Sequence, residues 1–152
     1  ERLRSYALMA LGALACGALG AAFDQLTVTL SPEYFTLGKG AALEGLRWSA
    51  ALIGFKGGLP LGALTAGVLR WSGSRAVLLR PLGFVAGAAG AAVLAGLICA
   101  LILLTFDPFQ VRVESRGILT AAAANRYLAC WGLHVGAYVG PLTFAGATLS
   151  RT

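Results

Sequence analysis

The sequence is poor in charged residues and in cysteine. Only 12% of its 152 residues are charged, against about 25% in a typical soluble domain, and 58% are hydrophobic. The mean hydropathy is +0.79. These values exclude a water-soluble globule and also a disordered chain, which needs low hydrophobicity and high charge. The 21 glycines have no three-residue period, which excludes collagen. The composition therefore indicates a membrane protein.

The three cysteines, Cys16, Cys99 and Cys130, all fall inside apolar runs. An odd number of thiols without metal-type spacing argues against a disulfide framework and against a zinc site. We interpret them as small packing residues and expect neither metal nor cofactor. A net charge of +6 could suggest nucleic acid, but with this hydropathy a membrane topology explains it better. We expect membrane lipid, and no nucleic acid, among the partners.

Four apolar runs are long enough to cross a bilayer, which needs about 20 helical residues. They do not alternate as barrel strands do, so we predict helices. The expected fold is an all-α integral membrane protein, a four-transmembrane-helix bundle forming one membrane domain over 1–152. We place the spans at 5–23, 48–69, 82–106 and 128–149, the outer loops at 24–47 and 107–127, and the inner loop at 70–81.

The first span has an alternative interpretation as a cleaved signal peptide, because Arg2 and Arg4 precede it and small residues end it. Its 19 residues, 5–23, exceed the usual signal core of about 7–15 residues. We therefore favour a retained span. The chain begins at Glu1 rather than Met, from which we expect that upstream sequence is missing or removed.

The distribution of basic residues predicts the orientation. The two termini and the inner loop hold six arginines against a single acid, whereas the basic and acidic residues of the outer loops cancel. Because Lys and Arg concentrate on the cytoplasmic side, both termini are expected in the cytoplasm, most naturally at the bacterial inner membrane. The six are Arg2, Arg4, Arg70, Arg75, Arg80 and Arg151.

Glycines recur at four-residue spacing within the predicted spans. In lipid, such flat faces let helix backbones approach closely and supply van der Waals contact. We therefore predict glycine-rich helix packing, inside the bundle or against another subunit. The residues are Gly54, Gly58 and Gly62, then Gly83 and Gly87, then Gly132, Gly136 and Gly140. Pro60 and Pro141 also lie within spans, either as structural bends or as hinges that line a site.

Four ionisable residues are expected at similar depth near the outer face, namely Asp24, Lys56, Asp107 and His134. A lysine at helix centre costs about 2.5–3.5 kcal/mol on insertion scales. One hypothesis is an outward-open polar pocket in which Asp24 or Asp107 neutralises Lys56. The alternative is that Lys56 snorkels outward and His134 is a neutral, hydrogen-bonded histidine. His134 as a lone ligand of haem or chlorophyll magnesium lacks a second ligand and an attachment motif.

The first outer loop alternates apolar and hydroxyl residues from Leu26 to Ser31, which predicts a short extended segment ended by Pro32. We expect Tyr34 and Phe35 to anchor this loop at the membrane interface. The loop is also the candidate outer-loop interaction surface, formed by Gln25, Thr27, Glu33, Tyr34 and Phe35.

The run DQLTVTLSPEYFTLGKG, followed by GLRWSAALIGFKGGLPLG, resembles a group of uncharacterised bacterial four-span membrane proteins. In that group a DQ-T pattern leads into SPEYFT, and the second span contains G-LPLG. The resemblance covers about the first half of the chain and implies a topology and a candidate surface, but no reaction. It falls on Asp24, Gln25, Thr27, Ser31 to Thr36, Gly58 to Gly62 and, loosely, His134.

Catalytic motifs are missing: the chain has no phosphate-binding glycine loop, no HExxH, no nucleophile elbow and no CxxC. We therefore expect no enzyme. The leading hypothesis is a small non-catalytic integral membrane protein, an accessory or structural subunit that binds other membrane subunits or itself. The alternative is a small transporter, channel or ligand-binding membrane protein that uses the predicted polar pocket.

Overall fold

The computed structural model describes residues 2–71 and 81–150, without the side chains of Trp71, residues 81–85 and Leu149. Most of the predicted inner loop, with Arg75 and Arg80, lies outside the described residues, as do Glu1 and Arg151. Within the described ranges the chain is helical and has no strand. The elements are α1 (Arg2–Leu30), η1 (Tyr34–Gly38), α2 (Leu46–Trp71), α4 (Pro81–Phe106), α5 (Val111–Glu114) and α6 (Ala121–Leu149).

Four of these helices are long and apolar enough to cross a membrane, which confirms the predicted all-helical fold with four candidate spans. Their candidate spans contain 29, 25, 21 and 28 residues. At 1.5 Å per residue, even the shortest covers a hydrocarbon core of about 30 Å. Pro60 and Pro141 lie inside α2 and α6, and neither helix is interrupted there.

The predicted extended segment after the first span is wrong, because α1 continues as a helix to Leu30. The hydroxyls of Thr27 and Thr29 each bond the carbonyl four residues earlier, at 3.2 and 3.0 Å, and so fit within a helix. The buried residues at this end recur with helical spacing: Asp24, Thr27, Val28 and Ser31.

The last helix also begins earlier than predicted, at Ala121 rather than at 128. The Thr120 hydroxyl accepts a hydrogen bond from the Ala123 amide at 3.2 Å and caps the helix start. The four alanines that follow Thr120 have the highest helix propensity of all residues, so they form the first turn of α6 instead of part of the loop.

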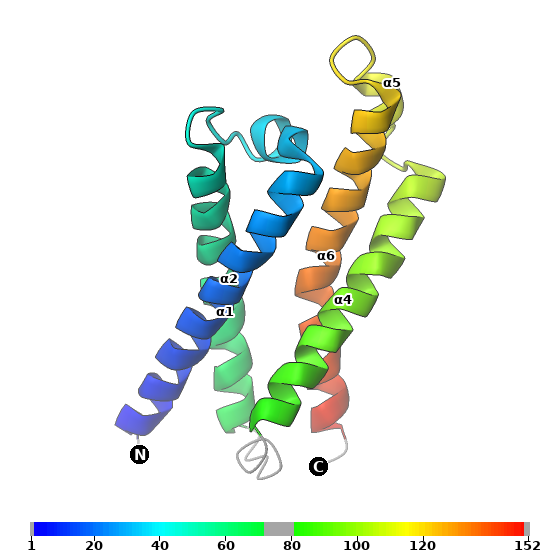
Figure 1. Cartoon of the computed structure of the whole chain (residues 1–152). Coiled ribbons are helices and arrows are strands. Elements are labelled where there is room, and N and C mark those ends of the chain that lie inside the picture. Colours follow the sequence, from blue (N-terminus) through cyan, green and yellow to red (C-terminus); the bar gives the residue numbers. More distant parts are fainter. Residues whose placement is uncertain (1, 72–80, 151–152) are drawn as a thin grey trace.

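The four long helices form two antiparallel pairs, which stand side by side in Figure 1. We call α1 with α2 the N-terminal hairpin, and α4 with α6 the C-terminal hairpin. Helices pack much more extensively within each hairpin than between the two. Both ends of the chain lie at one end of the molecule, the terminal end, whereas η1 and α5 lie at the opposite end, the loop end (Figure 1).

Within each hairpin, glycines lie where the two helix backbones meet. A Cβ atom added to Gly54, Gly58 or Gly62 of α2 would overlap backbone carbonyls of α1. On α6, a Cβ at Gly132, Gly136 or Gly140 would overlap the backbone of α4. Gly87 faces the Phe144 ring, and the surroundings of Gly83 are not described.

The buried core lies at the loop end, between the two hairpins. It contains Val28, Tyr34, Phe35, Ala50 and Cys130, with Ile53, Tyr127 and Trp131 packed against it. Many large apolar side chains elsewhere on the four helices are exposed, as expected for surfaces that face lipid. The core therefore marks the place where the two hairpins are held together.

Candidate functional site

A buried aspartate–histidine pair lies in this core. Asp24 of α1 and His134 of α6 are 110 residues apart in sequence, yet His134 Nε2 lies 2.9 Å from Asp24 Oδ1. Their side chains are only 3% and 6% exposed. The pair joins the N-terminal hairpin to the C-terminal hairpin, and each of its residues belongs to the predicted polar pocket.

The hydrogen bonds of His134 define how many protons the pair holds. His134 Nδ1 lies 2.8 Å from the carbonyl oxygen of Cys130, which can only accept, so Nδ1 carries a proton and donates it. Nε2 and Asp24 Oδ1 lie at hydrogen-bond distance, so one of these two atoms must carry a second proton, either on the imidazole or on the carboxyl group. In both forms the pair has a net charge of zero.

The second oxygen of this carboxyl group, Asp24 Oδ2, is buried and has no hydrogen-bond partner among the described residues. On the side of α2, Gly54 packs directly against the carboxyl group, because a Cβ there would lie 2.8 Å from Asp24 Cγ. The proton shared with His134 is therefore the one stabilising partner that the described residues give this carboxyl group.

Aromatic rings enclose the imidazole. The ring centroids of Phe23, Tyr34 and Phe35 lie 5.2, 4.7 and 5.7 Å from that of His134. Tyr34 and Phe35 come from η1, which folds back over the pair. Burial raises the pKa of the Tyr34 hydroxyl, so this group stays neutral near pH 7. The rings exclude water and lower the local dielectric around the pair.

Most of the predicted outer-loop surface is part of this enclosure. Thr27, Tyr34 and Phe35 are buried, so they do not anchor the loop at a membrane interface. Tyr34 and Phe35 pack against His134 and the core instead of facing outward. Gln25 donates to the Arg47 carbonyl at 2.8 Å, which ties α1 to the start of α2.

Glu33 connects the two hairpins a second time. Its carboxylate lies 3.3 Å from Arg126 Nη2 of α6 and also accepts from the Ser31 hydroxyl at 3.1 Å. The side chains of Arg126 and Glu33 are 44% and 27% exposed, so water screens this ion pair far more than the Asp24–His134 pair.

Lys56 and Asp107 are not brought to the pair. Asp107 follows α4 with a positive φ of 41°, and its carboxylate accepts from the amides of Val111 and Arg112 at 2.8 and 3.0 Å. It therefore organises the turn into α5. Lys56 is exposed on α2, and no ion pair found in the described ranges includes it.

Sequence reasoning missed Cys130 as a member of the site. Its thiol lies 3.7 Å from His134 Nδ1 and 3.8 Å from the Thr27 carbonyl oxygen. The order thiol, imidazole, carboxylate matches that of a nucleophilic triad. However, Nδ1 already donates to the Cys130 carbonyl, and Cys130 is fully buried. The thiol therefore has neither a base nor access to a substrate, and its four-residue spacing from His134 was the available signal.

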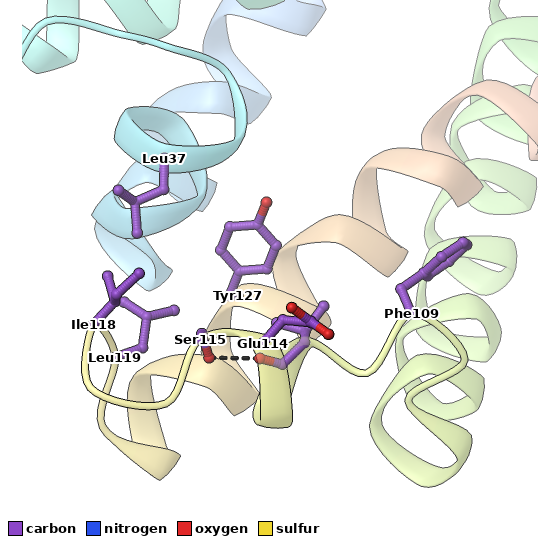
Figure 2. A pocket seen from close by; sticks show the side chains of 8 residues that line it. Leu37, Phe109, Glu114, Ser115, Ile118, Leu119 and Tyr127 are labelled. Atoms are coloured by element: carbon purple, nitrogen blue, oxygen red, sulfur yellow. Dashed lines mark hydrogen bonds between the residues drawn. The ribbon is translucent and has the colours of Figure 1, made fainter.

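A separate pocket of about 260 Å³ lies at the loop end, between η1, α6 and the connection around α5 (Figure 2). Its wall is mainly apolar, with Leu37, Phe109 and Ile118, and the polar groups of Glu114 and Ser115 lie on one side. Tyr127 lines it and also contacts the Tyr34 ring at 5.3 Å. The pocket therefore reaches the aromatic enclosure but not the pair itself.

The described residues contain no group of three or more His, Cys, Asp or Glu side chains that could hold a metal ion. Comparisons of the chain with protein-family models, with curated proteins and with solved structures found no match. The resemblance to the four-span bacterial group stays a prediction. The site must therefore be interpreted from its own geometry.

Proposed function

We propose that the chain is a small, non-catalytic integral membrane protein that works as an accessory or structural subunit, in a larger membrane complex or as a homo-oligomer. We place it in the bacterial inner membrane with both termini in the cytoplasm, so that the loop end faces outward. Support comes from the four long apolar helices, from both chain ends lying together, and from the basic terminal flanks.

The observation that carries this proposal is the exposed position of Lys56. It lies ten residues into α2, about 15 Å along the helix axis. Leu52 and Leu64, four residues before and eight after it, are also exposed and form one apolar face with it. A lysine facing lipid at this depth costs about 2.5–3.5 kcal/mol. A carboxylate from a neighbouring subunit would remove that cost, because Asp24 is already paired with His134.

The interior of each hairpin supports the same proposal. We attribute the close approach of the helices to the glycines on α2 and α6, since these positions leave no room for a side chain. Each hairpin is then a compact unit whose opposite faces are free for contact with lipid or with another subunit. The deep burial of Cys130, His134 and Asp24 fits a structural joint better than a reaction centre.

Native mass spectrometry from lipid nanodiscs tests the proposal. We expect a discrete assembly for the unaltered chain, and a Lys56→Leu variant whose assembled fraction falls by at least about tenfold, equivalent to about 1.4 kcal/mol. Arg116→Leu, which removes the same charge from an exposed loop position, is the matched control and keeps the assembly. The proposal would be overturned if the unaltered chain were monomeric at every concentration.

The second candidate is a small transporter, channel or ligand-binding protein. It is favoured by one specific observation, the hydrogen bond between Asp24 and His134 at membrane depth. In that case His134→Ala abolishes flux or ligand binding. Liposomes containing the purified chain provide the assay, with Asp107→Asn as a control at a residue that the structure assigns to a turn.

A further inference from the structure

We propose that the Asp24–His134 pair is a proton-binding site whose occupancy holds the two hairpins together. With one proton between the carboxyl group and Nε2, the pair is neutral and hydrogen-bonded. Release of that proton to water opens the joint. The inference concerns a regulated contact within the chain and does not depend on the chain being a subunit.

Loss of the proton removes the basis of the contact. The Nε2 lone pair would then face the negative Asp24 Oδ1 at 2.9 Å, and no described residue donates to Asp24 Oδ2. A buried carboxylate without a donor or a counter-charge is strongly disfavoured. The closed joint therefore requires its proton.

No other charged group in the surroundings can replace the proton. On α6, the ionisable neighbours are Cys130, Tyr127 and Tyr138, and on η1 it is Tyr34; none of them carries a positive charge. On α2, the residue against Asp24 is Gly54.

Two cations at the loop end, Lys39 and Arg126, have other partners. Lys39 Nζ lies 5.5 Å from the centroid of the Tyr34 ring, and Arg126 forms its ion pair with Glu33. Among the described residues of α4, none is charged between Ala86 and Phe106. Among the described residues, only His134 forms an ion pair or a hydrogen bond with the Asp24 carboxyl group.

The opened joint holds a different number of protons. An imidazole in contact with water loses its second proton near about pH 6.5, and an aspartate in water is ionised above about pH 4. The closed pair needs one proton for its hydrogen bond, whereas the two separated groups in neutral or basic water do not, so the closed form holds one proton more than the open form. Opening releases that proton, so each further pH unit favours the open form by about tenfold.

The place of the pair indicates where the proton goes. Asp24 lies six residues before the end of α1, about 9 Å from the loop end, and η1 covers it there. The helices of the two hairpins make few contacts with each other. Opening at the loop end therefore exposes the pair to the water on that side and also uncovers Cys130, which lies beside it.

Labelling of Cys130 tests the inference with the full chain in nanodiscs. N-ethylmaleimide is applied from about pH 7 to about pH 9, and mass spectrometry of the peptides separates Cys130 from Cys16 and Cys99. Asp24→Asn supplies the intrinsic pH dependence of the thiol, because an amide neither holds nor releases the proton. We divide the rate of Cys130 labelling in the unaltered chain by the rate in Asp24→Asn, and we expect this ratio to rise by about tenfold per pH unit.

Two controls make the outcome decisive. Glu33→Gln removes the other titratable contact between the hairpins and should keep the pH dependence. Cys16 and Cys99, outside the joint, should show no change in the same ratio. A ratio that is constant with pH would overturn the inference, and so would a Glu33→Gln variant in which the dependence disappears. If Asp24→Asn does not fold, Asp24→Ser takes its place, because it too has no carboxyl group that could hold or release the proton.

Discussion

Replacement of Gly136 by alanine is the sharpest test of how the C-terminal hairpin is held together. A Cβ atom at this position would overlap the backbone of Gly96 on α4. No flexible side chain can give way there, so α4 and α6 must move apart. Overpacking of this kind costs about 1–3 kcal/mol. We expect a loss of about 2 kcal/mol, which shifts the unfolding equilibrium by roughly thirtyfold.

Gly146 provides the matched control on the same helix. An added Cβ at Gly146 meets nothing within 4 Å, so Gly146→Ala creates no contact. Because alanine has the higher helix propensity, this variant should be neutral or more stable by up to about 1 kcal/mol. Reversible unfolding in mixed SDS and dodecylmaltoside micelles, followed by circular dichroism, measures both variants. Equal stabilities of Gly136→Ala and Gly146→Ala would refute the close backbone contact.

Three further predictions concern the loops and the orientation. Asp107→Ala should cost about 1 kcal/mol, because it removes the two hydrogen bonds that the backbone amides of Val111 and Arg112 donate at the start of α5. Faster proteolysis between α4 and α6 is the readout. Glu33→Gln should cost less than about 1 kcal/mol, because its ion pair with Arg126 is exposed, and added salt should reduce the difference from the unaltered chain. A cysteine at Leu43, 81% exposed in the loop before α2, should react with an impermeant maleimide from outside the cell, and one at Leu3, 82% exposed near the N-terminus, should not. Unchanged proteolysis would contradict the first prediction, and a large loss of stability that salt does not alter would contradict the second. Labelling at Leu3 but not at Leu43 would contradict the third.

The sequence contained enough information to predict the helices, since each span is a continuous apolar run of sufficient length. It did not locate their ends. The alternation of threonines with apolar residues after Phe23 predicts an extended segment, although hydroxyls that bond the carbonyl four residues back are common within helices. The predicted outer loop 107–127 includes the alanines after Thr120, although their helix propensity and the Thr120 cap favour a helix.

The pairing of Asp24 with His134 was partly predictable, because both residues were expected at similar depth. The position of Lys56 could also have been derived. Successive residues are about 100° apart around a helix, so Lys56 lies about 200° from Gly54. A glycine face directed at α1 therefore turns Lys56 outward. By the same spacing, His134 lies opposite the face of Gly132 and Gly136, which contact α4, and so points toward the other hairpin.

The aromatic enclosure could not be predicted from the residues alone. Tyr34 and Phe35 follow a span, as aromatic anchors of a membrane interface do, and nothing local distinguishes the two cases. Their burial depends on η1 folding back onto α6, where Tyr34 meets His134 and Tyr127. This contact joins segments about 100 residues apart, and only the arrangement of the two hairpins creates it.

A double-mutant cycle on Asp24 and His134 tests the central claim most directly, namely that this buried pair joins the two hairpins. Each single replacement, Asp24→Ala or His134→Ala, leaves the buried polar partner uncompensated and should cost about 3 kcal/mol in the free energy of unfolding. Removing both should cost little more than removing one, which corresponds to a coupling energy of at least about 2 kcal/mol. Independent, additive losses with a coupling below about 0.5 kcal/mol would contradict the claim.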